Sequence, residues 1–302
     1  MYCWMTRDMT QDYRKELPPI AFAIDDGYTE PCCVALRSLV ETTPDPSLLD
    51  VFVLHTALRS ESLRRLEKSA CGLRLRLRRV DAVDRRFPVN RWVTEAVYLR
   101  LSIGAALPEF DKAVYLDADL LATADIVPLL RTDLGGCPVG AVRDPQNPVL
   151  RLGVALPGWD RLGLSGDREY FNSGVMVLDL AKCRERRIFE RCALFLVERP
   201  QHVKFWDQDA LNWVVGDDWL RLDRRWNTLP ISAILTLPGE RYNAEEILPL
   251  TYLLADEGRA KIVHFAGKCK PWTESFPHCS ARERYADLQS RIRGMEATRP
   301  EV

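Results

Sequence analysis

The segment 113–121 constrains the fold of this chain more strongly than any other part of its sequence. It is an apolar, strand-forming run that delivers two carboxylates, Asp117 and Asp119, and then becomes apolar again. Aspartate is depleted in strands and costly to bury alone, so a strand ending on Asp-x-Asp indicates one site that uses both carboxylates. A divalent cation with oxygen ligands is one such site. A turn, with one aspartate capping a helix, is the alternative.

Short apolar runs alternate with segments of helical periodicity along the rest of the chain. This alternation predicts an α/β fold with a doubly wound, mostly parallel sheet, whose ligands bind at the carboxyl ends of the strands. The other strands are predicted at 19–24, 49–54, 73–78, 138–142, 175–180, 220–226 and 261–265. Helices are predicted at 31–40, 60–70 (capped by Ser60), 94–101, 124–130, 181–198, 206–215 and 281–292, and a flexible loop at 146–166.

Length and composition predict one soluble globular unit. The 302 residues are 47% hydrophobic and 28% charged, enough to bury a large core. We expect a lead-in over 1–17, a single domain over 18–292 and a tail over 293–302. No linker or repeat divides the middle of the chain.

Charge and cysteine content exclude several classes of partner and location. The formal net charge is -1, so no overall field attracts nucleic acid or anionic membranes. The arginines that alternate along 73–78 read as a solvated strand face. No apolar run is long enough to cross a bilayer, and residues 1–19 lack the pattern of a secretory signal. Nine scattered cysteines favour free thiols, so we expect a cytoplasmic protein with no nucleic-acid partner.

Polar side chains lie at the ends of several predicted segments, near the points where strands stop. Taken singly, each has an ordinary explanation: Asn172 begins a tripeptide common in turns, and His264 could be a hydrogen-bonded core histidine. Taken together, two carboxylates and an imidazole form a mixed oxygen and nitrogen site suited to Mn²⁺, and a lysine near a glycine suits a phosphate. The set is Asp25, Asp117, Asp119, Asn172, Asp207, Gln208, His264, Gly267 and Lys270.

Six short motifs, in order, resemble those of family 8 glycosyltransferases, the retaining transferases that include bacterial lipopolysaccharide galactosyl- and glucosyltransferases and glycogenin. The resemblance runs from about residue 20 to residue 272. It implies a GT-A fold, a UDP-sugar donor, and Mn²⁺ or Mg²⁺ as cofactor. The motifs are AIDDGY at 23–28, YLRL at 98–101, YLDAD at 115–119, FNSGV at 171–175, DQDALN at 207–212 and HFAGKCKPW at 264–272.

The resemblance also implies a role for each matched residue. Asp117, Asp119 and His264 would hold the metal. Asp25 and Tyr28 would hold the uracil end, Arg100 and Asn172 the donor sugar or diphosphate, and Gly267 and Lys270 the phosphates. Asp207 and Gln208 would flank the reacting sugar carbon as catalytic residues, and Asp144 would meet the acceptor. Gly27 departs from the family, which often has asparagine there. The long basic and aromatic tail of some relatives is not found after Trp272, so a cytoplasmic or membrane-peripheral location is expected.

The function implied is transfer of galactose or glucose, with retention, to a hydroxyl of a saccharide, lipid-linked or small-molecule acceptor. Asp207 is a candidate nucleophile, and the Gln208 carbonyl could stabilise positive charge on the sugar. We favour attack from the side of the leaving group, with a diphosphate oxygen taking the acceptor proton. The alternatives are hydrolysis of the donor, a non-catalytic sugar-nucleotide binder and a nucleotidyltransferase. The last is expected to carry a basic, glycine-rich loop where this chain has Asp25 and Asp26.

Overall fold

The computed structural model describes residues 17–81, 84–88 and 95–297. The predicted lead-in therefore lies outside the described residues except for its last residue, as does the end of the predicted tail. Among the described residues, no helix combines the length and the apolar character needed to cross a membrane.

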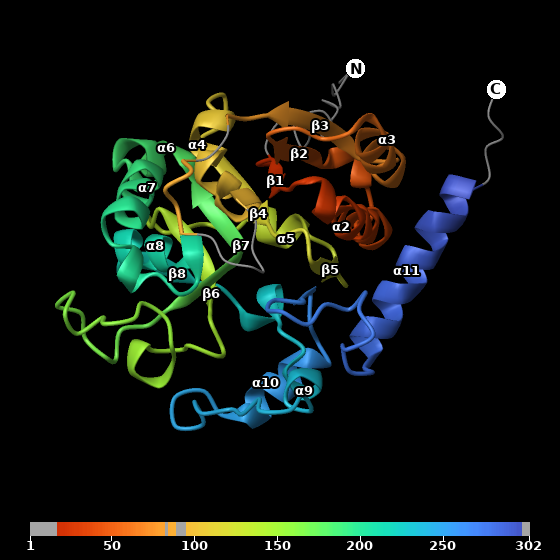
Figure 1. The fold of residues 1–302 in the computed structure, drawn as a ribbon. Helices are drawn as coiled ribbons and strands as arrows, with labels where there is room; N and C mark the ends of the chain where they lie inside the picture. The colour runs from red at the N-terminus through yellow and green to blue at the C-terminus, as the bar shows by residue number, and fades with distance from the viewer. Residues whose placement is uncertain (1–16, 82–83, 89–94, 298–302) are drawn as a thin grey trace, which may run out of the picture.

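A seven-stranded mixed sheet lies at the centre of the molecule, with the order β3-β2-β1-β4-β7-β6-β8 (Figure 1). All neighbouring strands are parallel except at β7, which runs antiparallel to β4 and β6. The central strands are almost wholly apolar because both faces of the sheet are covered. The strands are β1 (Ile20–Ala23), β2 (Asp50–His55), β3 (Arg74–Arg79), β4 (Lys112–Leu116), β6 (Val139–Arg143), β7 (Phe171–Asp179) and β8 (Trp219–Arg221).

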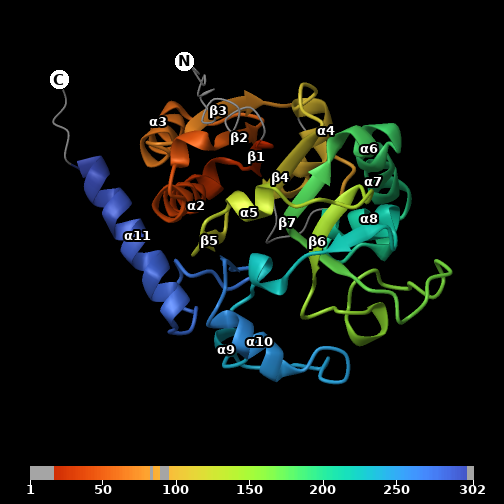
Figure 2. The same cartoon turned by 180° about the vertical axis from the view of Figure 1, so that it is seen from behind.

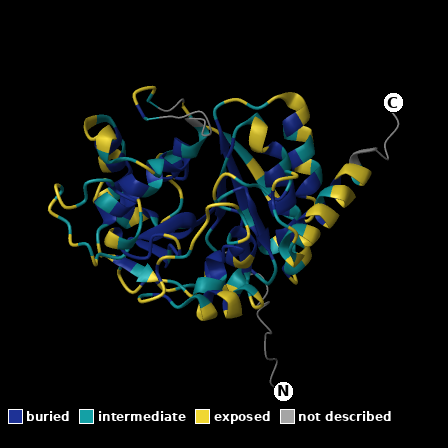
Figure 3. Cartoon of the chain, turned by 60° about the horizontal axis from the view of Figure 1, so that its bottom comes forward, coloured by how far each residue is buried: buried dark blue, intermediate teal, exposed yellow. Residues whose placement is uncertain are grey.

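Helices cover both faces of this sheet, and a separate hydrophobic core fills each side (Figures 1 and 2). One core includes side chains of α2 (Thr29–Thr42), α3 (Ser60–Ser69), α5 (Val127–Leu130) and α11 (Ser280–Ala297). The other includes α4 (Ile103–Ala106), α6 (Leu180–Glu185), α7 (Ile188–Glu198) and α8 (Trp206–Val215). Figure 3 shows the sheet strands buried and the outer face of α11 exposed. The α/β class and the mostly parallel sheet are confirmed.

A small satellite packs below the sheet. Helices α9 (Ile231–Ile234) and α10 (Leu250–Glu257) share a third apolar cluster there (Figure 1). Residues 228–246 were expected to form a loop, and α9 lies within them, whereas no element was predicted for α10. The segment 146–166 has only a 3-10 turn at Leu150–Leu152, in agreement with the predicted loop.

Several predicted elements differ in extent from those observed, and two of them are interrupted where the sequence carries no clear signal. The single helix expected over 181–198 is broken between α6 and α7, where Arg187 adopts a left-handed conformation with φ of 51°. The strand expected over 220–226 ends at Arg221. The side chain of Asp223 accepts a hydrogen bond from the Arg225 backbone and starts a 3-10 helix, Arg224–Asn227. Local periodicity misses both changes, because neither break carries a proline or glycine.

Ser60 does not cap the second helix. The N-cap of α3 is Arg59, whose own side chain makes no cap bond. Asp26, in the loop after β1, accepts hydrogen bonds from the Arg59 backbone at 3.0 Å and from the Ser62 hydroxyl at 2.6 Å. A carboxylate that is distant in sequence thus takes the place of the expected local cap. The helix expected over 94–101 is likewise a 3-10 helix, Glu95–Ser102, that continues into α4, and its residue 94 lies outside the described part of the chain.

Candidate active site

The ends of four strands meet at one edge of the sheet. Strands β1, β4 and β6 have their carboxyl ends there, and antiparallel β7 begins there. The residues that follow or begin these strands include Asp25, Asp117, Asp144 and Asn172. The backbone of Asp117 donates to the carbonyl of Gly174 at 2.8 Å, which joins β4 to the start of β7. This is the edge where ligands are expected in α/β sheets.

Strand β7 starts four residues earlier than predicted, so Asn172-Ser173-Gly174 lies within the strand. A turn at this tripeptide was the alternative, and it is wrong. The register between β6 and β7 shifts from Ala141 opposite Met176 to Val142 opposite Asn172. Such an irregularity bends a strand and redirects its side chains.

A second, two-stranded sheet brings His264 to the same edge. Strand β5 (Leu120–Ala122), which the sequence did not predict, pairs antiparallel with β9 (Ile262–His264). Leu120 lies opposite His264, and the Phe265 backbone donates to the Asp119 carbonyl at 2.9 Å. The run predicted as the last strand of the main sheet therefore lies in a separate sheet.

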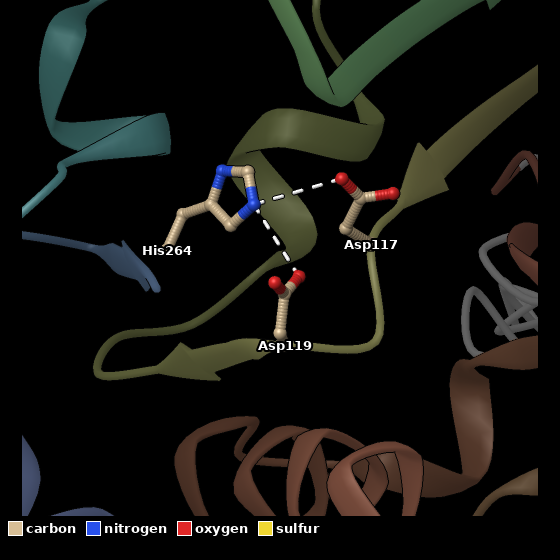
Figure 4. A group of neighbouring side chains, drawn as sticks. All are labelled: Asp117, Asp119 and His264. Carbon is tan, nitrogen blue, oxygen red and sulfur yellow. Dashed lines mark ion pairs between the residues drawn. The ribbon is translucent and has the colours of Figure 1, made fainter. Parts of the chain in front are cut away.

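Asp117, Asp119 and His264, hereafter the metal cluster, lie with one ligand atom of each within 4.8 Å of the others (Figure 4). Nε2 of His264 is 3.4 Å from Oδ1 of Asp119 and 3.6 Å from Oδ2 of Asp117. His264 and Asp119 are buried, 3% and 6% exposed. Two carboxylates and an imidazole suit Mn²⁺ or Mg²⁺ better than a soft metal.

The backbone beside the metal cluster is shaped to leave room for it. A Cβ added at Gly174 would lie 2.2 Å from Cε1 of His264 and 3.0 Å from Oδ2 of Asp117. Glycine is therefore required at this point of β7, for space and not for an unusual φ. The donor set and the space left for it fit a divalent cation held by the metal cluster.

Lys270 brings a positive charge to the same place. Its Nζ contacts Oδ2 of Asp119 and donates to the Phe265 carbonyl at 2.9 Å. Burial would raise the pKa of Asp119, but Lys270 and His264 outweigh it and hold the pKa below its usual value. The Asp119 carboxylate is thus ionised and available as a ligand near neutral pH.

Arg100 ties Asp117 to the opposite side of the site. It is 6% exposed, and Nη2 lies 2.8 Å from Oδ1 of Asp117. Nη1 donates to the carbonyl and hydroxyl of Ser173 at 3.1 and 3.0 Å. Nε of Arg100 forms an ion pair with Oδ2 of Asp207, 2.9 Å away. The same Nε donates its hydrogen to the Val97 carbonyl. Burial opposes its charge, but Asp117 and Asp207 outweigh burial and raise its pKa.

Asp207 is buried and only partly compensated. It is 2% exposed, whereas its neighbour Gln208 is partly exposed. Burial raises its pKa to about 7, with Arg100 opposing and Asp117 reinforcing the shift. The two predicted catalytic residues therefore differ: Gln208 lies nearer the surface, and Asp207 lies behind it against Arg100.

The pKa of Asp207 predicts a pH-dependent stability that an Asp207→Asn variant would lack. Its pKa is about 7 in the folded protein and about 3.9 in an unfolded chain. Between these values the folded state binds more protons, so the free energy of unfolding falls as pH rises. We expect the free energy of unfolding of the wild type, minus that of the variant, to fall from about pH 4 to about pH 7 and then level off. Urea unfolding in EDTA measures it, and a pH-independent difference would contradict the assignment.

A chain of hydrogen bonds connects the remaining polar residues. Asp144 accepts from Asn172 at 3.0 Å and from Gln208 at 3.2 Å. Asn172 accepts from Asn227 at 2.9 Å, and Asn227 contacts Nδ1 of His264 at 2.9 Å. Sequence reasoning missed Asn227. Its only signal was a polar residue directly after the segment 220–226, which was predicted as a strand.

The residues expected to hold the nucleotide lie at the end of β1 and after β9. Asp25 caps a 3-10 turn, and its Oδ1 accepts from the Tyr28 backbone at 3.2 Å. The Tyr28 ring, 36% exposed, meets Trp272 edge-on with centroids 6.1 Å apart. Gly267 has φ of 95°, which favours glycine in the turn that leads to Lys270. An exposed aromatic ring and the partly buried Lys270 thus lie on the part of the chain where the nucleotide is expected.

Comparisons with known proteins agree with this geometry. Residues 19–275 match the model of glycosyl transferase family 8. General stress protein A of Bacillus subtilis is 27% identical over 279 residues, 88% of this chain and 91% of that protein. Lipopolysaccharide 1,2-glucosyltransferase of Escherichia coli K12 is 26% identical over 257 residues, 84% of this chain and 72% of that protein. The crystal structure of galactosyltransferase LgtC with donor and acceptor sugar analogs has a TM-score of 0.71 at 26% identity, covering 94% of this chain and 98% of LgtC. The GT-A fold is thereby confirmed.

Proposed function

The chain belongs to glycosyl transferase family 8, and we propose that it is a retaining hexosyltransferase that moves galactose or glucose from a UDP-sugar to a hydroxyl acceptor with Mn²⁺ as cofactor. That it is a glycosyltransferase follows from the family and from its named relatives. The observation that supports the finer proposal is the metal cluster at the strand ends. Two carboxylates and a histidine beside the partly buried Lys270 suit a diphosphate and a divalent ion together.

The leaving group in such a reaction is UDP, whose charge rises as the bond to the sugar breaks. Asp117, Asp119 and His264 would hold the ion, which when bound would supply Lewis-acid stabilisation of the diphosphate. We propose that Lys270 and the turn at Gly267 contact the phosphates. Asp25 and Tyr28 are proposed to hold the uracil end, next to Trp272. Arg100 is buried, and we propose that it acts on the donor mainly through Asp117.

The sugar side of the reaction favours attack from the leaving-group side. Asp207 is buried and paired with Arg100, a poor position for a nucleophile. Gln208 is partly exposed, and its Oε1 accepts from the Ser173 backbone at 3.0 Å, so its amide is held in one orientation. We propose that Gln208 lies against the reacting sugar and that a diphosphate oxygen takes the acceptor proton. Asn172 would contact the donor from within β7.

The acceptor and the location are part of the same proposal. We propose a saccharide, lipid-linked or small-molecule acceptor met by the loop 146–166, and a cytoplasmic or membrane-peripheral protein whose residues 18–292 form one domain. Arg151 in that loop pairs with Glu246, 2.5 Å away, so the loop is tied to the segment before α10. The two segments together would form the acceptor side.

A panel of UDP-sugars tests this function directly. We expect UDP release with UDP-galactose or UDP-glucose in the presence of Mn²⁺, faster when a saccharide acceptor is added, and its loss in EDTA. The α-anomeric configuration of the product, read by NMR, tests retention. Calorimetry with UDP and Mn²⁺ completes the test. UDP binding without release or transfer from any sugar in the panel would favour a non-catalytic binder, and release that persists in EDTA would remove the metal from the proposal.

A further inference from the structure

We propose that Asp144 is a positioning residue that determines which nitrogen of His264 carries the proton, and so keeps the lone pair on the nitrogen that faces the rest of the metal cluster, acting through the amides of Asn172 and Asn227. The inference rests on the metal role proposed above for His264. Asp144 directly follows β6 and is 4% exposed. Among the contacts of the described residues, Asp144 makes none with His264 or with the aspartates of the metal cluster, so its effect must pass through the amides between them.

The Asp144 carboxylate is held rigidly at one oxygen. Oδ1 accepts from the backbone N–H groups of Gln146 and Asn147, both at 2.9 Å. Oδ2 accepts from Nδ2 of Asn172 at 3.0 Å and from Nε2 of Gln208 at 3.2 Å. An ionised carboxylate only accepts hydrogen bonds, so both amides must turn their NH₂ groups toward it.

The orientation of Asn172 is fixed twice over. Its Oδ1 accepts from the backbone N–H of Gly174 at 2.9 Å, which can only donate. The same Oδ1 receives Nδ2 of Asn227 at 2.9 Å. Because that oxygen carries no proton, Asn227 must present its NH₂ group to Asn172. Its own carbonyl oxygen then faces His264.

This order of donors and acceptors selects the tautomer of His264. Oδ1 of Asn227 lies 2.9 Å from Nδ1 of His264 and can only accept, so Nδ1 carries the proton. The neutral ring then has its lone pair on Nε2, the nitrogen nearest to both carboxylates of the metal cluster. That lone pair is placed to bind a cation between the ring and the two carboxylates, and a hydrogen-bonded second nitrogen is how proteins orient such ligands.

The same carboxylate also orients Gln208. With Nε2 of Gln208 turned to Asp144, its Oε1 accepts from the Ser173 backbone at 3.0 Å. Asp144 thus sets the polarity of two amides, one leading to the metal cluster and one to the proposed sugar contact. The acceptor contact expected of Asp144 from the family stays a prediction.

An Asp144→Asn variant tests the relay. In this variant the backbone N–H groups that bind Oδ1 would keep the new carbonyl oxygen in that place. The new NH₂ group would then face the NH₂ groups of Asn172 and Gln208. We expect the Asn172 amide, now opposed at its NH₂ group and held only at its oxygen by the Gly174 N–H, to lose its single orientation and His264 to lose its Nδ1–H preference. The chain has four histidines, so metal-free protein labelled with ¹⁵N-histidine resolves the tautomer by NMR at a pH where they are neutral, with a His264→Ala spectrum for assignment. The expected Mn²⁺ affinity with UDP present is about 10- to 100-fold weaker.

The matched control is Asp179→Asn, at the far end of β7. Asp179 caps α6 by accepting from the Lys182 backbone, a bond that asparagine also makes, so tautomer and Mn²⁺ affinity are expected to stay unchanged. Should Asp144→Asn fail to fold, Asn227→Ala removes the last link instead. A wild-type His264 with its proton on Nε2, or an Nδ1–H tautomer that survives in both variants, overturns the relay. The relay is supported if His264 carries its proton on Nδ1 in the wild type and loses this preference in the variants. Failure of the wild type to bind Mn²⁺ would overturn the metal role alone and would leave the relay standing.

Discussion

Replacing Asp117 or Asp119 by alanine is expected to abolish Mn²⁺-dependent transfer while the fold survives. Each change removes one ligand of the metal cluster and with it much of the charge that holds the departing diphosphate. A loss of about 10³-fold or more in kcat/KM is expected, because the stabilisation acts in the transition state. Sugar-transfer assays with and without EDTA measure it, beside calorimetry of Mn²⁺ binding.

The fold is expected to survive because the cations around the pair keep other partners. Without Asp117, Arg100 still pairs with Asp207, and without Asp119, Lys270 still donates to the Phe265 carbonyl. Asp111→Ala is the matched control, since Asp111 precedes the same strand at its other end and its side chain is 91% exposed. We expect its activity to equal that of the wild type. Full activity of either ligand variant in EDTA would refute the metal assignment.

The sequence predicted the parts of the site that short motifs carry. Asp25 and Asp117 each follow a buried strand directly, so local pattern together with the rule for strand ends places them at one edge. The helix that carries Asp207 and Gln208 was predicted with the bounds that the structure has, because its apolar periodicity is uninterrupted. In such stretches a short window contains the information that positions the side chain.

What the sequence did not reveal depends on contacts between distant residues. His264 was expected in the main sheet, and it instead pairs through β9 with a three-residue strand, β5, too short to leave a pattern. Asn227 gains its meaning only from Asn172 and His264, which are 55 and 37 residues away in sequence. The early start of β7 arises from pairing of its first residues with β6 and not from its own composition. Tertiary pairing decides these features, and a single sequence does not display it.

A Gly174→Ala variant is expected to lose about 100-fold or more in activity and most of its Mn²⁺ affinity, although one methyl group is the whole change. The added Cβ would lie 2.2 Å from Cε1 and 2.6 Å from Nδ1 of His264, far inside contact distance. The backbone of Gly174 needs no positive φ, so alanine is tolerated there except for the contacts of its Cβ with His264 and Asp117. His264 must therefore move, and its bond to Asn227 must break or lengthen. Transfer assays and Mn²⁺ calorimetry measure the loss.

A double-mutant cycle separates this mechanism from a general disturbance of the strand. If Gly174→Ala acts by displacing His264, then adding it to a His264→Ala variant costs much less, because the ring it would strike is gone and only the 3.0 Å contact with Oδ2 of Asp117 remains. If the added methyl group instead overpacks other parts of β7, the free energy of unfolding would fall by roughly 1–3 kcal/mol in both the wild-type and the His264→Ala backgrounds. Gly294→Ala in α11 is the control. A Cβ at this position meets nothing within 4 Å, and alanine is more favourable than glycine inside a helix. Additive losses in the cycle would show that Gly174 does not act by leaving room for the His264 ring.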